Sequence, residues 1–597
     1  MLFRSHEEPL TITIFNRHFL KKNMQVGMML TIIGKYSASK KAITASDLKL
    51  KNLKEISGIT PVYSLKEGLT QKSFQGYVNK ALNFYKGHIA NTIPLYLCQK
   101  YHLIDKEDAL FKIHQPQTRS DVISALRYLK YEEFFKFQMT MQYIKQNRTQ
   151  NIGISKLIDK EKVTHFIEKL PFQLTDDQKK VVDDILIDLT SQKLMYRFVQ
   201  GDVGSGKTVV AAISLYANYL AGYQGAMMAP TEILALQHYQ SLKKMFKKYK
   251  INIALLTGHL SQKEKNEIYQ QLENGQIDII IGTHALFQEK VQYNQLGLVI
   301  TDEQHRFGVR QRSTLAEKGE NVHTLVMTAT PIPRTLALIL YGDLDISIID
   351  ELPPGRQKID TLAVDSRYHP RIYAFIEKHV AAGRQAYVIC PMIEENEKLE
   401  VQSVLEYTAE LTEELPHCRV ACVHGKMKAK EKQTIMDSFA AGEIDVLVST
   451  TVVEVGINVP NATIMLIENA ERFGLAQLHQ LRGRVGRGAE KSYCILVSDT
   501  KTRVAKERMK TMTESEDGFV ISEKDLKLRG PGEFFGIRQH GLPELKIADL
   551  CRDLPILKEA QAAAAELLRK DRNLEQTEHQ PLKARIAGYL DGKRLEM

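Results

Sequence analysis

The segment GDVGSGKT at 201–208 has the residue types and spacing of a phosphate-binding loop. The strand-like run RFVQ precedes it and the helix-like run VVAAISLYANYL follows it, which argues against a glycine-rich turn that binds no nucleotide. Small residues let backbone N–H groups surround phosphate oxygens, and a helix N-terminus favours negative charge. We predict that Lys207 contacts the β- and γ-phosphates of ATP and that the Thr208 hydroxyl binds Mg²⁺. The other predicted nucleotide contacts in the loop are Gly201, Asp202, Val203, Gly204, Ser205 and Gly206.

An acidic pair, Asp302 and Glu303, follows an apolar run in the sequence LVITDEQH. A phosphate loop needs a carboxylate on another strand, and this pair lies downstream of Lys207 after a run that is typical of a buried strand. We predict that Asp302 binds Mg²⁺ directly or through water, and that Glu303 orients and deprotonates the attacking water. The alternative interpretation is an exposed acidic turn.

A basic cluster, HQLRGRVGRG, occupies residues 479–488. Arg484 and Arg487 are three residues apart, which places them on one face of a helical turn. We predict that they are arginine fingers directed at the γ-phosphate, a role that can raise a rate about 10³–10⁵-fold. The alternative is a basic patch that faces solvent or nucleic acid.

The sequence around these motifs has five textures, at 1–64, 65–160, 161–351, 352–511 and 512–597. The first alternates apolar and polar residues, as in a small β-barrel or sheet, and the second has helical spacing. The third and fourth alternate short apolar strands with amphipathic helices. This pattern predicts an α/β fold class with two tandem domains, each a parallel sheet covered on both faces. The last segment is helical and charged.

Composition and charge exclude several classes of protein. Of 597 residues, 43% are hydrophobic and 25% charged, which is typical of a soluble globular protein. No apolar run approaches the roughly 18 residues of a membrane span, and the N-terminus lacks a signal-peptide core, so we expect no membrane partner and a cytoplasmic location. Six cysteines do not form a disulfide framework. A net charge of +10 permits a polyanionic partner without demonstrating one.

The lysine-rich segment KKMFKKYK at 243–250 has two interpretations. It could bind nucleic acid, but the spacing of Met245, Phe246 and Tyr249 favours a helix packed on the sheet. We therefore predict that its lysines lie in solvent.

Taken in order, nine motifs between about 172 and 488 resemble those of superfamily 2 helicases and translocases. They are PFQLTDDQ, GDVGSGKT, APTEILALQH, GTHAL, DEQH, TATPIPRTL, VHGKM, STTVVEVGINVP and QLHQLRGRVGRG. The resemblance implies that the two tandem domains are RecA-like lobes with ATP between them.

The same resemblance implies roles for individual residues. Gln178 would read the adenine edge, Phe172 would pack on the base, and Gly456 would lie near the ATP cleft in the second lobe. Asn458 stands where many relatives have Asp, so a ribose contact there would keep an acceptor oxygen and lose a charge. Residues implied to couple hydrolysis to movement or to lie in segments lining the nucleic-acid groove are Thr328, Thr330, Pro230, Thr231, Glu232, Thr283 and His284.

Both ends of the chain resemble the RecG family. The tail DLKLRGPGEFFGIRQHGLPEL at 525–545 resembles that family's translocation motif, which transcription–repair coupling factors partly share. It implies a coupling loop containing Arg529 and Gln539, with His540 departing from the usual Ser. The segment TIFNRHFLKK at 13–22, followed by GMMLTIIGKY, resembles the second half of the family's wedge, an oligonucleotide-binding fold.

Two aromatic residues, Phe15 and Phe19, would cap bases at a fork junction in that wedge. Stacking suits this task because every base has a π face. Their sequence pattern alone favours the alternative that both are barrel core.

The wedge itself looks incomplete. An oligonucleotide-binding barrel needs five strands, and residues 1–64 offer three. We predict a partial barrel that lacks the first part of the wedge, with a strand at 10–15 left unpaired at an edge. ATP hydrolysis would then persist while fork recognition is weakened.

The resemblance implies an ATP-driven translocase on double-stranded DNA that remodels stalled forks and Holliday junctions in recombination and repair. Its duplex contacts should be to phosphates and therefore independent of sequence. The implied partners are forked, four-way and duplex DNA and single-strand-binding protein, in a monomer associated with the bacterial nucleoid. The alternatives are an RNA helicase, a transcription–repair coupling factor, a primosomal helicase, and a DNA-binding scaffold with an inactive ATP site.

Overall fold

The computed structural model describes residues 2–5, 8–14, 24–25, 27–28, 31–37, 42–49, 59–65, 68–148, 153, 155–303, 318–319, 321–328, 333, 337, 344–353, 357–391, 397–450, 459–488, 490–529, 545–549, 552–584 and 586. The chain forms two compact units, Met1–Glu133 and Phe134–Met597, and each is described by itself.

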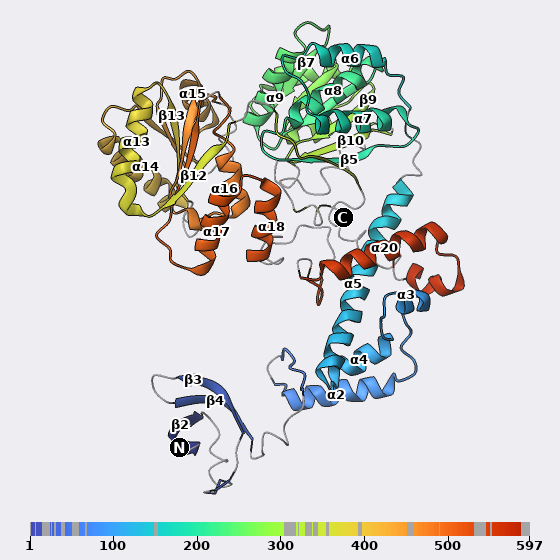
Figure 1. The fold of residues 1–597 in the computed structure, drawn as a ribbon. Helices are drawn as coiled ribbons and strands as arrows, with labels where there is room; N and C mark the ends of the chain where they lie inside the picture. Colours follow the sequence, from blue (N-terminus) through green and yellow to red (C-terminus); the bar gives the residue numbers. More distant parts are fainter. Residues whose placement is uncertain are drawn as a thin grey trace. The chain divides into compact units, whose positions relative to one another are not determined.

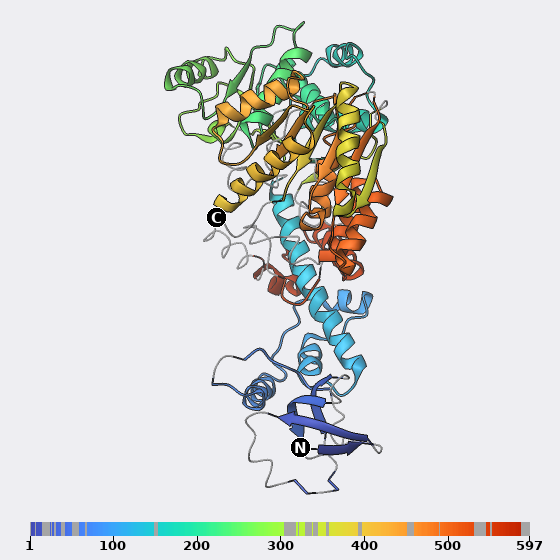
Figure 2. The ribbon, with the colours of Figure 1, turned by 90° about the vertical axis from the view of Figure 1, so that its left-hand side faces the viewer.

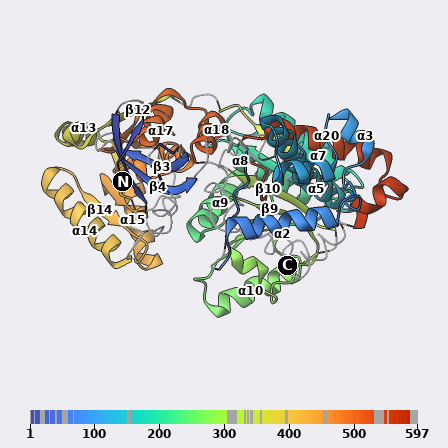
Figure 3. The ribbon, with the colours of Figure 1, turned by 90° about the horizontal axis from the view of Figure 1, so that it is seen from below.

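The first unit opens with a four-stranded sheet of order β1-β2-β4-β3 (Figures 2 and 3). Its strands are β1 (Leu2–Ser5), β2 (Glu8–Ile14), β3 (Thr31–Ser37) and β4 (Ala42–Lys49). Strands β1 and β3 are antiparallel to their neighbours, whereas β2 and β4 are parallel to each other.

This sheet corrects two expectations about the wedge. The described residues between 2 and 49 contain four strands, whereas three were expected in 1–64. The strand expected at 10–15 is β2, which lies inside the sheet and not at its edge. The reason is β1, whose Ser5 pairs with Glu8 and whose Leu2 pairs with Thr11. This hairpin satisfies the backbone groups of β2 on the side away from β4.

Helices complete the first unit, in agreement with the helical spacing of the sequence. They are α2 (Gln71–Phe84), α3 (Leu95–Lys100), α4 (Lys106–His114) and the start of α5 (Arg119–Arg148), which continues into the second unit. A buried ion pair joins α4 to α5, because the Lys106 ammonium lies 2.8 Å from a Glu132 carboxylate oxygen.

The second unit contains two parallel sheets, which confirms the predicted α/β class. The sheet of lobe 1 (described residues between 155 and 353) has the order β11-β5-β10-β9-β6-β8-β7, and every recorded pairing in it is parallel. Its strands are β5 (Tyr196–Gly201), β6 (Gln224–Met228), β7 (Ile253–Leu256), β8 (Ile279–Gly282), β9 (Leu296–Thr301), β10 (His323–Thr328) and β11 (Asp345–Ile349).

Helices cover both faces of the lobe 1 sheet (Figure 1). Met227 and Ile300 pack against the core formed with α6 to α9, while their neighbours Met228 and Val299 pack on the opposite face with Leu272 of α10. The helices are α6 (Lys160–Glu168), α7 (Asp176–Thr190), α8 (Lys207–Leu220), α9 (Glu232–Met245) and α10 (Gln262–Glu273), with the 3-10 helix η3 (His284–Phe287).

Lobe 2 (described residues between 357 and 529) has a six-stranded parallel sheet of order β12-β17-β16-β13-β15-β14. Its strands are β12 (Ile359–Val364), β13 (Gln385–Ile389), β14 (Val420–Val423), β15 (Val446–Ser449), β16 (Ala462–Ile467) and β17 (Ser492–Val497). Its helices are α13 (His369–Ala381), α14 (Glu397–Glu414), α15 (Ala429–Ala440), α16 (Leu475–Arg482), α17 (Arg503–Glu514) and α18 (Gly518–Arg529), with the 3-10 helices η5 (Ser366–Tyr368) and η6 (Ala470–Arg472).

The helix pair α17–α18 belongs to the core of lobe 2. Met509 and Met512 of α17 and Ile521 of α18 are buried in the same cluster as Tyr387 and Ile467 of the sheet. The expected boundary at 511/512 therefore falls within α17, and the domain boundaries stay predictions. Beyond this pair lie α20 (Leu554–Lys570) and η7 (Thr577–His579).

The lysine-rich segment at 243–250 packs on lobe 1 with its lysines in solvent, as predicted, but its helix ends at Met245 and the rest is a turn. Phe246 is buried in the lobe 1 core and Met245 and Tyr249 pack against it, whereas Lys247 and Lys248 are exposed. Within the described residues no helix has both the length and the apolarity needed to span a membrane.

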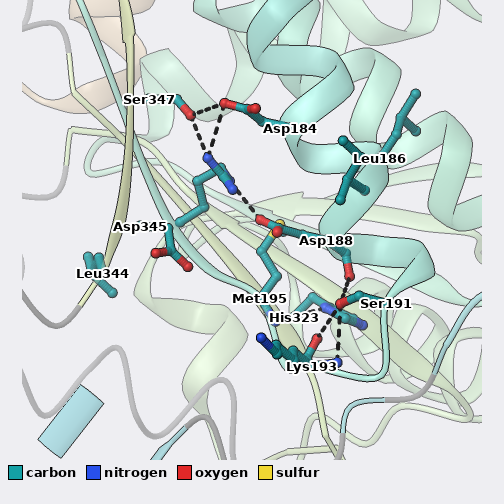
Figure 4. A network of polar contacts seen from close by, with 12 residues as sticks. Asp184, Leu186, Asp188, Ser191, Lys193, Met195, His323, Leu344, Asp345 and Ser347 are labelled. Carbon is teal, nitrogen blue, oxygen red and sulfur yellow. Dashed lines mark hydrogen bonds and ion pairs between the residues drawn. The ribbon is translucent and has the colours of Figure 1, made fainter. Parts of the chain in front are cut away.

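A polar network fixes α7 against strands β5 and β11 (Figure 4). The Arg197 guanidinium donates to Asp188 at 2.7 Å, to Asp184 at 3.3 Å and to the Ser347 hydroxyl at 2.6 Å. The Ser347 hydroxyl in turn donates to Asp184 at 2.9 Å. Because the Arg197 side chain is only 11% exposed, these two carboxylates compensate a charge that water reaches poorly.

We expect Arg197→Ala to lower the stability of lobe 1 by about 2 kcal/mol, because it leaves two carboxylates without their cation. Calorimetry should show this as a fall of about 4–8 °C in the unfolding midpoint. Lys179→Ala is the control, since the Lys179–Asp176 pair is 57% and 88% exposed and should contribute under about 1 kcal/mol. Equal midpoints for the two variants would contradict the role given to Arg197.

Candidate active site

Most of the predicted site residues of lobe 1 lie at one edge of its sheet. All strands of this sheet are parallel, so their carboxyl ends meet there. The segments that follow β5, β6, β8 and β9 contain the phosphate loop, Thr231, Thr283 and Asp302, and Thr328 is the last residue of β10. The topology thus brings together residues that are more than 100 positions apart.

The phosphate loop has the backbone that its glycines allow. Gly204 and Gly206 have φ angles of 79° and 82°, in the left-handed region that favours glycine. Gly206 is also the N-cap of α8 and has no side chain to cap it. A side chain at Gly206 would collide with the amide of Gln178, and one at Gly201 would collide with the Ser205 hydroxyl. The left-handed backbone therefore favours glycine at 204 and 206, whereas a side chain at Gly201 would require the Ser205 hydroxyl to move.

Lys207 is held inside the loop. Its ammonium donates to the carbonyl oxygens of Gly201 at 2.7 Å and Asp202 at 2.8 Å, and it lies 3.4 Å from the Ser205 hydroxyl. The residue is 8% exposed, and the next residue, Thr208, is half-buried. The ammonium is thus placed within the loop that would surround a phosphate.

Asp302 follows β9 and is fixed by a histidine that the sequence analysis did not single out. His238 of α9 contacts one Asp302 carboxylate oxygen through Nε2 at 2.8 Å, while the backbone N–H of Glu303 donates to the other at 3.1 Å. Burial opposes ionisation of Asp302, but the hydrogen bond from His238 and the charges of His238 and Lys207 lower its pKa overall. The Asp302 carboxylate is therefore ionised at neutral pH, as its predicted role of metal ligand requires.

Glu303 has a strained backbone. Its φ of 52° lies in the left-handed region, which costs a residue with a side chain on the order of 1–3 kcal/mol. Strain of this kind concentrates at functional positions. Its predicted role as general base stays a prediction.

Gln178 lies beside the phosphate loop, on the first turn of α7. Its amide nitrogen donates to the Ser205 carbonyl at 2.7 Å and its amide oxygen accepts from the Thr175 N–H at 3.0 Å. The side chain is 2% exposed, so it supports the loop in addition to any contact with adenine. Phe172, the predicted base-stacking residue, is 47% exposed.

The predicted arginine fingers follow α16 in lobe 2. Arg484 and Arg487 are both half-buried, and the Arg487 guanidinium donates to the Gly483 carbonyl at 3.2 Å. Gly483 lies against Val203 of the phosphate loop, where a Cβ would come within 2.7 Å of a Val203 methyl. The segment that carries the arginines thus begins at a contact with the loop.

The predicted nucleic-acid residues divide into exposed and buried groups. His284 is exposed at the start of η3, and the half-buried Thr231 caps α9 by accepting from the Leu234 N–H at 3.3 Å. Thr283 and Thr328 are 2% and 1% exposed, so their side chains are not on the surface. Pro230 and Glu232 flank Thr231, and the Glu232 carboxylate accepts from the Gly258 N–H at 2.6 Å.

Several predicted residues lie outside the described part of the chain: Phe15, Phe19, Thr330, Gly456, Asn458, Gln539 and His540. Arg529 is the last residue of α18.

The residues at this edge fit ATP and Mg²⁺. A glycine-rich loop with a buried ammonium suits phosphate oxygens. The Thr208 hydroxyl and the ionised Asp302 carboxylate are the oxygen ligands that Mg²⁺ prefers.

Three family models match the chain. A DEAD/DEAH box helicase model matches residues 175–339, a helicase conserved C-terminal domain model matches 370–489, and a model of domain 3, C-terminal, of the ATP-dependent DNA helicase RecG matches 515–589.

Curated and solved relatives cover more of the chain. ATP-dependent DNA helicase RecG of Bacillus subtilis (strain 168) is 47% identical over 98% of this chain and 86% of its own length. The protein of the same name from Streptococcus pneumoniae is 46% identical over 94% of this chain and 83% of its own length. A solved structure of RecG bound to a three-way DNA junction is 42% identical, with a TM-score of 0.69, over 93% of this chain and 75% of that one.

We expect Gln178→Ala to raise KM for ATP about tenfold, because the variant loses the donor that holds the Ser205 carbonyl. If Gln178 also reads the adenine edge, the preference for ATP over GTP falls as well. A steady-state assay of ATP and GTP hydrolysis measures KM for ATP and the preference for ATP over GTP. Lys180→Ala, an exposed change on the same helix, is the control and should leave KM unchanged. Unaltered kinetics in Gln178→Ala would contradict both roles.

Proposed function

The chain belongs to the RecG family of ATP-dependent DNA helicases, and we propose that it moves along double-stranded DNA to reverse stalled forks and migrate Holliday junctions. The observation that carries this proposal is the occurrence in one chain of a complete phosphate-loop site and a segment that matches RecG domain 3. The three-way junction in the solved RecG relative supports branched DNA as the substrate class.

In this proposal the residues at the lobe 1 edge perform hydrolysis. Lys207 exchanges its carbonyl contacts for phosphate oxygens, and Thr208 and Asp302 hold Mg²⁺, which when bound supplies charge neutralisation at the phosphates. Glu303 orients the attacking water and accepts its proton. Arg484 and Arg487 of lobe 2 supply positive charge where negative charge develops.

Movement of lobe 2 would carry the translocation segment. Helices α17 and α18 share the core of lobe 2, so they move with its sheet, and α18 ends at Arg529. We assign the coupling contact with duplex phosphates to Arg529 and Gln539, and base stacking at the junction to Phe15 and Phe19. These four roles rest on the family resemblance. The same resemblance is the basis for the roles of Gly456 and Thr330, a monomeric state, nucleoid association and a single-strand-binding-protein partner.

The proposal is tested by ATPase rates on a panel of nucleic acids of equal length. Forked and four-way DNA should stimulate hydrolysis more than linear duplex, and RNA should stimulate it least. Lys207→Ala should abolish hydrolysis on every substrate, because no other cation in the described loop occupies that position. Stronger stimulation by RNA than by forked DNA would point instead to an RNA helicase.

We also expect fork affinity to depend on salt and not on base sequence. A protein that contacts 6–10 phosphates loses about 10³–10⁵-fold in affinity between 50 and 200 mM salt. Fluorescence anisotropy on two forks of unrelated sequence should give equal Kd values at each salt concentration. A variant with Lys247→Ala and Lys248→Ala should keep the parental salt dependence, since both lysines lie in solvent on lobe 1. A loss of one unit or more in its log–log slope would show that this segment contacts DNA.

A further inference from the structure

Helix α2 of the first unit carries an exposed aromatic face (Figure 1). Tyr77 and Phe84 are 61% and 78% exposed. They lie seven residues apart, which places them on one face of the helix, about 10 Å from each other along its axis. Tyr85 follows at the end of α2, 57% exposed, with its ring edge-on to that of Phe84 at 5.1 Å. Apolar side chains grouped in this way on a surface indicate a binding site.

The opposite side of α2 already has its packing partners. Leu82 is buried, and the Phe74 ring lies 4.9 Å from the Tyr63 ring. The Asn79 side chain accepts a hydrogen bond at 3.0 Å from the amide of Gln115, the residue that follows α4. These contacts fix the inner side of the helix and leave the aromatic face available for a partner.

The segment that contains α2 is basic. Residues 68–104 include no Asp or Glu, although 71 of the 597 residues of the whole chain are acidic. The lysines of this segment are Lys72, Lys80, Lys86 and Lys100. The first three are exposed and form no ion pair with any residue that the structure describes. The Glu107 carboxylate does contact the segment, but beyond α2, where it accepts from the Gly87 N–H at 2.8 Å. The charge around the rings therefore complements a polyanion.

Gly76 lies inside α2, where glycine destabilises a helix relative to alanine. Neighbouring residues do not require it, because a Cβ added at this position would meet no heavy atom within 4 Å. Lys72, Gly76 and Lys80 follow one another at intervals of four residues and so form one stripe along the helix. Uncovered backbone between two ammonium groups allows a phosphate to approach closely.

The basic stripe and the aromatic face lie side by side on α2. Lys80 is three residues from Tyr77 and four from Phe84, so it neighbours both rings on the helix surface. A single strand of nucleic acid has the matching pair of features, which are a row of phosphates and unpaired bases that stack on aromatic rings. Duplex DNA lacks free base faces, and an apolar protein surface lacks phosphates. The combination therefore favours a single strand.

We propose that α2 and the residue that follows it form a binding site for single-stranded DNA. Phosphates lie along Lys72, Gly76 and Lys80, and separate bases stack on Tyr77 and Phe84. The site reads no base sequence, because every base has a π face. The identity of the strand as DNA, separated when a fork is remodelled, rests on the proposed function, whereas the binding of a single strand does not.

The test measures binding of the full chain to a fluorescent oligothymidylate by anisotropy, without ATP. We expect Tyr77→Ala combined with Phe84→Ala to raise Kd at least about tenfold, because one lost stack weakens binding by about that factor. Tyr77→Phe combined with Phe84→Tyr keeps both rings and should keep Kd within about twofold of the parent. The control is Ile123→Ala on α5, a 60% exposed apolar side chain of the same unit, which should also keep the parental Kd. A parental Kd in the variant without rings would overturn the proposal.

The phosphate contacts are tested by the salt dependence of the same Kd. Each phosphate that a protein neutralises on a single strand contributes about 0.7 to the slope of log Kd against log salt. Lys72→Ala combined with Lys80→Ala should therefore lower the slope by about 1.4. The matched control, Lys247→Ala with Lys248→Ala on lobe 1, should leave it unchanged. A parental slope in the first pair would overturn the basic stripe.

Crosslinking of the parent covers the case in which a variant does not fold or a second surface also binds the strand. Irradiation of the complex with an oligonucleotide that contains 5-iodouracil should join the base to Tyr77, Phe84 or Tyr85, as read by mass spectrometry. Crosslinks confined to other segments would overturn the proposal. A parental dimer that the variant without rings loses, with Kd unchanged, would assign the face to a second copy of the chain. Failure of forked DNA to stimulate hydrolysis would instead overturn the proposed function and leave this site standing.

Discussion

The structure depends on keeping a few buried side chains ionised at the edge of the lobe 1 sheet where the carboxyl ends of its strands meet. The lobe 1 edge holds one ammonium, on Lys207, and two carboxylates, on Asp202 and Asp302, all 9% exposed or less. Burial disfavours the ionised form of each side chain, and specific hydrogen-bond partners stabilise it. These partners are the loop carbonyls for Lys207, His479 for Asp202 and His238 for Asp302. The proposed mechanism uses the charges of Lys207 and Asp302, and the fold supplies their partners.

The two histidines perform the same task in different places. His238 belongs to α9 of lobe 1, so the geometry of Asp302 is set within one lobe. His479 belongs to α16 of lobe 2, so the geometry of Asp202 depends on how the lobes meet. Asp302, the proposed metal ligand, is therefore held within one lobe, whereas Asp202 is held by a side chain of the other lobe.

Much of this arrangement follows from the sequence, because strand–helix alternation and the loop motif are local patterns. Both parallel sheets and the solvent-exposed lysines at 247 and 248 agree with those patterns. The pairings made by His238 and His479 were not predicted, although both histidines lie in quoted motifs, since each pairing joins residues at least 64 positions apart. The short strand β1 was missed because four residues are too few to show an alternating pattern.

At Glu303 the left-handed backbone makes the fold less stable, while the side chain supplies a carboxylate. A glycine there would adopt the same φ without strain, so the substitution would relax the fold while removing the carboxylate. In the proposed mechanism, such a protein would be more stable and would hydrolyse no ATP, because it lacks the general base. The fold thus gives up stability at this position to keep the carboxylate that the proposed mechanism uses.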